Sequence, residues 1–296
     1  MRSLNMFEFI YKLQDLSTKV IGMNARNIHL VNPNNPRKYF QLANNKFLTK
    51  NWLQVNGFPC AKTIATIQSK FQISECFEKI KNIQSMVIKP SQSFGGKGIL
   101  LLQEKTPEGN WLTPSKKIIK EENFKSHCTD ILSGIFSNEG REETVLIEEK
   151  LMPNDEFMPE LKCLSDLRVI CLKDKIVLAM VRIPTQKSGG KANLHAGGIG
   201  LGVDLKTGKI TQAIQSGQKI THHPDNQFPL IGHQIPSWSQ IVEKSNRLVQ
   251  KFPLKYIGID WALATPFPQI LEINSRPGLE IQNANGIGLR ELCNDL

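Results

Sequence analysis

Residues 256–278 read YIGIDWALATPFPQILEINSRPG, and most of what the sequence says about architecture starts from them. Two apolar runs, 256–263 and 269–275, are predicted to be strands because they are short, rich in isoleucine and bounded by turn residues. They lie close together in the sequence, so we treat them as neighbouring strands. Polar side chains inside such apolar strands need partners and are the first candidates for a functional site.

Three such side chains form a possible metal site. Glu272 and Asn274 are two positions apart on a strand and therefore point to one face of the sheet. Asp260 lies on the neighbouring predicted strand. Two carboxylates and an amide oxygen on one face are suited to Mg²⁺, which bridges nucleotide phosphates in phosphoryl transfer. The alternative is a solvated strand face, which any Glu-x-Asn pattern can produce.

A glycine-rich segment, KPSQSFGGKG, begins at Lys89. The predicted strand 86–90 delivers the lysine, and a second predicted strand covers 98–102. Glycines let backbone N–H groups approach phosphate, and lysine supplies charge. The segment is not a Walker A loop because Lys97 is followed by Gly98 rather than by serine or threonine. An ordinary hairpin turn explains the segment equally well.

A third cluster comes from the predicted hairpin of strands 167–172 and 175–184. Asp166 and Arg168 share a strand face, and Arg182 lies on the partner strand. Arginine forks suit phosphate and carboxylate groups, but a cross-strand surface ion pair is the simpler alternative. A single histidine in the following glycine-rich turn, His195, is given a structural role.

The remaining pattern predicts an α+β fold without regular βαβ alternation. A proline- and asparagine-rich loop is expected at 31–37, and a long polar loop at 215–236. A further strand is expected at 145–151, and the hairpin segment 202–210 is expected to turn at Lys206-Thr207-Gly208. The predicted helices cover residues 4–20, 46–56, 74–84 and 237–251.

Composition narrows the class of protein. The chain has 296 residues, 40% hydrophobic and 22% charged. Its net charge of +10 is explained equally well by a generally basic surface and by attraction of ATP and acidic substrates. The basic residues are scattered, so no nucleic-acid partner is predicted. No apolar run spans a membrane, and the amphipathic N-terminus does not resemble a signal peptide, so a cytoplasmic protein is expected. The six cysteines form no metal or disulfide pattern, and reduced, mostly buried thiols are expected.

Together, the motifs resemble the ATP-grasp superfamily, and most closely its alpha-L-glutamate ligase-like branch. That branch is related to the ribosomal-protein glutamate ligases and, more distantly, to glutathione synthetase. The supporting stretches occur in order along the chain: GMNARN (22–27), NNKFLTK (44–50), VIKP (87–90), GGKGI (95–99), DLRVI (166–170), ANLHAGGIGLGVD (192–204), GID (258–260) and LEINSRPGLEIQ (271–282).

The resemblance implies two α+β lobes with ATP bound between them, at 46–150 and 151–296, after an N-terminal helical segment at 1–45. It also implies roles by position. Nucleotide contacts fall on Lys50, Lys89, Gly95, Gly96, Lys97, Gly98, Glu148, Glu149, Lys150, Leu151, Asp166 (for the ribose) and Asn193. The catalytic arginines would be Arg168, Arg182 and Arg276, and the ligands of two Mg²⁺ ions, or of Mn²⁺, would be Asp260, Glu272 and Asn274.

The implied reaction joins a carboxylate to an amine through an acyl-phosphate, with small molecules or peptides as substrates and glutamate favoured. The chain departs from the ribosomal-protein ligases at Lys191 and Ala196, where those enzymes carry arginines. The sequence before Lys50 is also too short for the separate substrate domain of many relatives. An ATP-grasp-like kinase acting on a hydroxyl and a non-catalytic nucleotide-binding protein remain alternatives. The oligomeric state, including a homo-oligomer, is left open.

Overall fold

The computed structural model describes residues 19–93, 95–137, 140–161 and 163–294. It divides the chain into two compact units, each built from separate parts of the sequence. Unit 1 contains residues up to Phe40, Pro153–Pro268 and Ile273 onward, whereas unit 2 contains Gln41–Met152 and Gln269–Glu272. The predicted helix at 4–20 lies almost wholly outside the described residues. The lobe boundaries expected at 45/46 and 150/151 stay a prediction.

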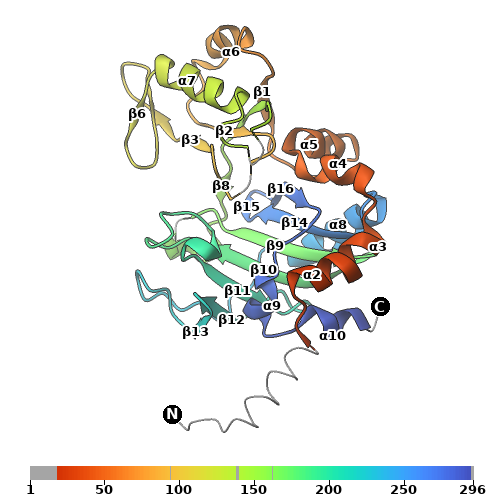
Figure 1. The fold of residues 1–296 in the computed structure, drawn as a ribbon. Coiled ribbons are helices and arrows are strands. Elements are labelled where there is room, and N and C mark those ends of the chain that lie inside the picture. The colour runs from red at the N-terminus through yellow and green to blue at the C-terminus, as the bar shows by residue number, and fades with distance from the viewer. Residues whose placement is uncertain (1–18, 94, 138–139, 162, 295–296) are drawn as a thin grey trace. The chain divides into compact units, whose positions relative to one another are not determined.

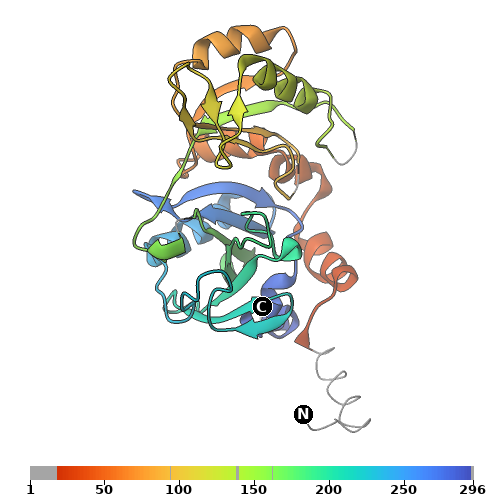
Figure 2. The same ribbon diagram turned by 90° about the vertical axis from the view of Figure 1, so that its left-hand side faces the viewer.

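Unit 2 is built on a four-stranded antiparallel sheet in the order β1-β7-β2-β3. Helices α6 and α7 pack along this sheet and enclose one apolar core that includes Ile88, Phe124 and Ile147 (Figures 1 and 2). A small sheet, β4-β5-β6, adds Trp111 to the same core. The elements are α4 (Phe40–Asn44), α5 (Lys46–Val55), β1 (Thr63–Ile67), α6 (Gln72–Ile80), β2 (Met86–Pro90), β3 (Leu100–Leu102), β4 (Glu104–Lys105), β5 (Trp111–Leu112), β6 (Ile118–Ile119), α7 (Glu121–Leu132) and β7 (Val145–Glu149), followed by β8 (Met152–Pro153) at the boundary.

Unit 1 is built on a larger sheet with the strand order β13-β12-β11-β10-β9-β14-β16. The two faces of the sheet differ because side chains alternate along each strand. Trp261 of β14 donates its indole N–H to Ser245 of α8, whereas Tyr256 belongs to a core that contains Ile281 of α9. The elements are β9 (Asp166–Leu172), β10 (Lys175–Ile183), β11 (Ile199–Val203), β12 (Ile210–Gln215), β13 (Gln218–Ile220), α8 (Trp238–Lys251), β14 (Tyr256–Ala262), β15 (Ala264–Thr265), β16 (Gln269–Asn274), α9 (Glu280–Asn285), α10 (Leu289–Asn294) and the 3₁₀ turns Pro159–Leu161 and Leu194–Ala196.

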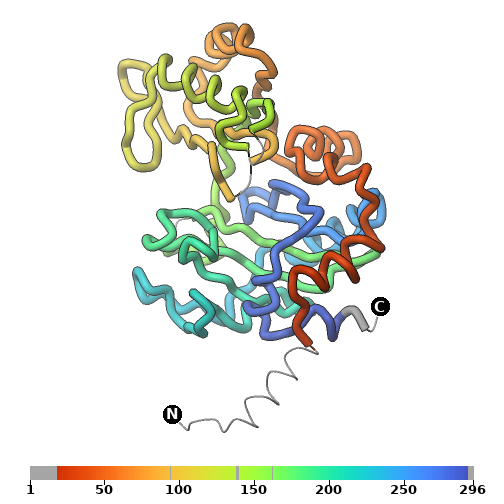
Figure 3. Tube along the Cα trace, viewed as in Figure 1, coloured from red at the N-terminus to blue at the C-terminus, as the bar shows by residue number. Residues whose placement is uncertain are grey.

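The residues before unit 2 are part of the core of unit 1. They form α2 (Met23–Arg26), a π-helical turn (Asn27–Val31), α3 (Asn32–Asn34) and a 3₁₀ turn (Arg37–Tyr39), which Figure 3 traces beside the C-terminal helices. Ile21 exchanges backbone hydrogen bonds with the side chain of Gln282. The Asn35 side chain donates to the carbonyl oxygens of Tyr256 and Ser275 at 2.7 and 3.0 Å. It also accepts from the backbone N–H groups of Lys255 and Tyr256.

Most predicted elements are confirmed, and the differences have local causes. The expected loop at 31–37 contains α3, which begins next to Pro33, because proline is compatible with the first turn of a helix. The small sheet at 104–119 was not predicted, and β13 lies inside the expected polar loop at 215–236. The α+β class is confirmed. Within the described ranges, no helix is both long and apolar enough to cross a bilayer.

Candidate active site

In unit 2, two lysines converge on one carboxylate. Val87 of β2 pairs with Glu148 of β7, so Lys89, two positions further along β2, lies on the same face as Glu148. Helix α5 brings Lys50 to this face. Glu148 lies 2.5 Å from the Lys50 ammonium and 2.7 Å from that of Lys89. All three side chains are less than 10% exposed, so the cluster is a buried ion triad with a net positive charge.

Burial and charge act on these groups in opposite directions. Burial raises the pKa of the Glu148 carboxyl, but the charges of Lys89 and Lys50 outweigh burial and hold its pKa below the ordinary value. For Lys50, burial is the largest influence and lowers its pKa in spite of the Glu148 charge. The triad therefore has two buried cations for one anion. An anionic ligand would neutralise this excess positive charge.

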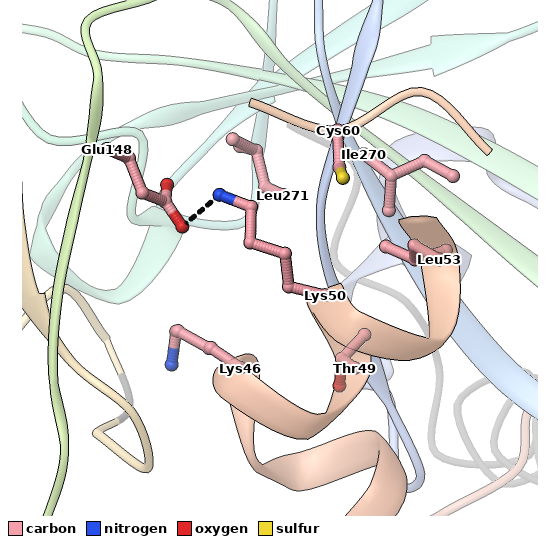
Figure 4. A pocket seen from close by; sticks show the side chains of 8 residues that line it. All are labelled: Lys46, Thr49, Lys50, Leu53, Cys60, Glu148, Ile270 and Leu271. Atoms are coloured by element: carbon pink, nitrogen blue, oxygen red, sulfur yellow. Dashed lines mark ion pairs between the residues drawn. The ribbon is translucent and has the colours of Figure 1, made fainter. Parts of the chain in front are cut away.

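A small pocket of unit 2 opens beside this triad (Figure 4). Helix α5 forms one wall, and the segment of β16 that belongs to this unit forms another. Lys46 of α5 forms an ion pair with Glu272 across 3.4 Å. Lys50 and Glu148 lie at the polar end and aliphatic side chains at the other. The lining residues are Lys46, Thr49, Lys50, Leu53, Cys60, Glu148, Ile270 and Leu271.

The glycine-rich loop leaves the same sheet, between β2 and β3. Gly95, Gly96 and Gly98 have φ angles of 65°, 73° and 72°, a region that only glycine enters without strain. Lys97 is exposed and forms no ion pair with any residue that the structure describes. The segment is therefore a loop of successive left-handed turns rather than a two-residue hairpin turn.

Residues 149–151 lie at the end of β7 and directly after it. The exposed Glu149 carboxylate accepts the backbone N–H of Lys62 at 2.8 Å. Lys150 and Leu151 follow the strand and are partly buried. Their expected role as nucleotide contacts stays a prediction.

In unit 1, an arginine–carboxylate network lies across three adjacent strands. Asp260 of β14 is directly opposite Arg168 of β9, and Asp166 of β9 is opposite Arg182 of β10. Arg168 forks onto Asp260 with bonds of 2.7 and 2.5 Å. Arg182 donates to Asp166 and, at 2.9 Å, to Asp260. The expected proximity of Arg182 to the β9 pair is confirmed, and the network is mostly buried.

The predicted metal ligands are engaged in protein contacts here. Asp260 accepts from both arginines and, at 3.3 Å, from the side-chain amide of Asn274. Glu272 precedes Asn274 by two residues on β16 and forms the ion pair with Lys46. Among the described residues, no group of three or more His, Cys, Asp or Glu side chains is placed to hold a metal ion. The donor set of two carboxylates and one amide oxygen fits Mg²⁺ in chemical type.

Arg276 and Asn193 lie outside these two clusters. The Arg276 guanidinium lies over the Phe40 ring, 5.0 Å from its centroid, in unit 1. The Asn193 side chain caps the following 3₁₀ turn by accepting the backbone N–H of His195. His195 is exposed, and the structural role expected for it stays a prediction.

The architecture of these units is similar to that of solved ATP-grasp ligases. D-alanyl-alanine synthetase A from Vibrio cholerae matches with a TM-score of 0.50 at 13% identity, over 86% of this chain and 63% of that chain. Phosphoribosylamine–glycine ligase from Thermotoga maritima matches with a TM-score of 0.50 at 17% identity, over 86% and 54%. At such identities the likeness establishes the fold, which is ATP-grasp.

The sequence identifies a narrower family among proteins with the ATP-grasp fold. Residues 25–296 match the profile of the sugar-transfer associated ATP-grasp family, and the chain belongs to that family. It is also 28% identical over 171 residues to tetrahydromethanopterin:alpha-L-glutamate ligase of Methanocaldococcus jannaschii. That match covers 57% of this chain and 47% of the relative, so the chain spans about half the length of the relative it matches.

Several contacts of the site were not anticipated from the sequence. Glu148 was expected as a nucleotide contact, whereas its side chain here links both lysines. Antiparallel pairing of strands 86–90 and 145–151 would have placed Lys89 and Glu148 near each other, so the signal was present. The Lys46–Glu272 pair joins segments 226 residues apart, and no local pattern marks it.

Proposed function

We propose that this protein is an ATP-dependent carboxylate–amine ligase that forms an amide through an acyl-phosphate. The observation that carries the proposal is the buried Lys50–Glu148–Lys89 triad, which has an excess of positive charge at the base of a glycine-rich loop. Family membership and the ATP-grasp fold support the same reading. Lysines of this kind stabilise the charge of nucleotide phosphates because they are fixed before the reaction begins.

In the proposed reaction, the substrate carboxylate attacks the γ-phosphorus of ATP, the bond to the β-γ bridging oxygen breaks, and ADP leaves. The amine then attacks the acyl carbon, inorganic phosphate leaves, and the amine loses a proton. The arginine forks of Arg168 and Arg182 match phosphate oxygens. To receive a phosphoryl group they would exchange their bonds to Asp260 and Asp166 for bonds to the substrate.

Mg²⁺ would be held by oxygens of Asp260, Glu272 and Asn274 and would neutralise charge on the nucleotide phosphates. The chain's own task is to position the reactants, because no side-chain nucleophile is required. We take glutamate as the preferred amino-acid substrate because the relative from Methanocaldococcus jannaschii is an alpha-L-glutamate ligase. The family is described as associated with sugar transfer, and on that description we add sugar-derived carboxylates to the candidate substrates.

Hydroxylamine provides the test because it intercepts an acyl-phosphate as a hydroxamate. The protein is incubated with ATP, Mg²⁺, hydroxylamine and a panel of carboxylates that includes glutamate, glutamate-ended peptides and uronic acids. A hydroxamate whose formation matches ADP release supports the ligase. Stable phosphorylation of a hydroxyl without hydroxamate would instead identify a kinase and refute the proposal.

A further inference from the structure

The glycine-rich loop is held at its first end by two side chains of unit 2. The backbone N–H of Lys46 donates to the Ser91 carbonyl oxygen at 2.7 Å, and the Lys46 ammonium donates to the Ser93 carbonyl oxygen at 2.6 Å. Between them, the Gln92 N–H donates to Oε2 of Glu143 at 2.7 Å. Three consecutive residues are thereby fixed before the first glycine.

Glu143 is an unusual residue for this position. It is 5% exposed and forms no ion pair with the residues that the structure describes. Oε2 accepts the Gln92 N–H and lies 3.4 Å from the Ser91 hydroxyl, and the other oxygen, Oε1, is buried without a hydrogen-bond partner among the described residues. A buried carboxylate is costly to the folded state, and the contacts that Glu143 makes, to the Gln92 N–H and the Ser91 hydroxyl, both lie at the start of the loop.

The second end of the loop is held from helix α7 and the turn that follows it. The His127 ring nitrogen Nε2 lies 3.0 Å from the Gly98 carbonyl oxygen, and because a carbonyl oxygen only accepts, Nε2 carries the hydrogen. The ring of Phe136 packs beside His127, with centroids 5.5 Å apart. A Cβ atom at Gly98 would lie 2.6 Å from Phe136, so the backbone passes directly against this pair.

We propose that Glu143 and His127 are positioning residues that fix the two ends of the glycine-rich loop and so present Lys97 to the phosphates of a bound nucleoside triphosphate. This inference rests on the proposed function for the identity of the ligand. The glycines at 95, 96 and 98 leave the backbone between the two ends free to adjust, and the two side chains limit how far it can move. Less conformational entropy is then lost when the loop closes on phosphate.

Limited trypsin digestion of the nucleotide-free protein tests the anchoring directly, because Lys97 is an exposed cleavage site within the loop. Glu143→Leu and His127→Leu each remove one anchoring hydrogen bond. We expect cleavage after Lys97 to become about fivefold faster in each, the scale of one net hydrogen bond in a local opening equilibrium. Mass spectrometry identifies the cleaved bond.

Matched variants separate anchoring from general damage. Glu143→Gln keeps an oxygen that accepts the Gln92 N–H, and His127→Gln keeps a donor, so both should be cut at close to the wild-type rate. Glu142→Leu changes the exposed neighbour of Glu143 and should not alter the rate. If Glu143→Leu does not fold, His127→Leu and His127→Gln make the comparison.

Nucleotide affinity tests the positioning role. The Leu variants should bind AMP-PNP with Mg²⁺ about fivefold more weakly than wild type but bind AMP equally well, because AMP lacks the phosphates that Lys97 would reach. Equal weakening for both nucleotides, or wild-type cleavage rates in both Leu variants, would overturn the inference. If wild-type protein binds no AMP-PNP, the proposed function fails, and the trypsin rates alone still decide whether these side chains hold the loop.

Discussion

Replacing Glu148 by glutamine should destabilise the protein strongly at neutral pH. The change removes the only carboxylate within 4 Å of the Lys50 and Lys89 ammonium groups among the described residues, and both lysine side chains remain less than 10% exposed. Losing one partner of a buried ion pair costs about 3–5 kcal/mol. Lys50 limits this cost because burial already lowers its pKa, so it can lose its proton.

We therefore expect a loss of about 3 kcal/mol in the free energy of unfolding, near the lower end of that range. For a domain of this size, the melting temperature should fall by about 6–12 °C. Urea unfolding at pH 7 measures the free energy. Glu149→Gln serves as the matched control, because Glu149 is exposed and glutamine still accepts the Lys62 N–H.

The pH dependence gives a second check. The folded-state pKa of Glu148 lies below its ordinary value, so its stabilising contribution is complete above the unfolded-state pKa of about 4.3. The contribution is lost as the pH falls through the folded-state pKa. The difference between wild type and Glu148→Gln should consequently shrink as the solution is acidified. A Glu148→Gln variant within about 0.5 kcal/mol of wild type at pH 7 would show that the triad is not the buried cluster described above.

Four other substitutions test the remaining parts of the molecule. Glu272→Ala and Asn274→Ala should each lower ADP release by about 10²-fold or more, and near-normal turnover in both would remove them from the metal site. Asn35→Ala should cost about 3 kcal/mol in urea unfolding, because it removes four hydrogen bonds to backbone groups, three of them buried; a change below about 1 kcal/mol would contradict this. Arg276→Lys keeps the charge but loses the fork, so turnover should fall more than ATP affinity; an equal fall in both would contradict a role in the reaction.

The parts of the fold that could be predicted are those with strong local patterns. β14 and β16 were placed to within one residue because their apolar runs end at clear turn signals. Helix α7 was overlooked although Phe124, Cys128 and Ile131 follow helical spacing, because the intervening residues are polar. At α3 the sequence predicts a loop, because proline and asparagine favour turns when no tertiary contact is known.

In the candidate site, too, the features with local patterns could be predicted and the contacts between distant segments could not. Residue types and spacing were sufficient to nominate Lys89, Arg168, Arg182 and Glu272, whereas Lys50 and Arg276 followed only from the family resemblance. Their partners depend on which strands lie side by side, and β9 lies between β10 and β14 through connections that sequence does not specify. The fork of Arg168 on Asp260 and the convergence of two lysines on Glu148 are therefore consequences of register.

The discontinuous make-up of unit 1 has a consequence for biosynthesis. A ribosome releases residues 21–35 long before it has made Tyr256, Ser275 and Gln282, the groups to which Ile21 and Asn35 bond. Most of unit 2 emerges in one continuous stretch and can begin to fold in the order of synthesis, apart from its short segment of β16. The N-terminal residues of unit 1 must wait, with Ile21, Leu30 and Val31 uncovered, until translation is nearly complete.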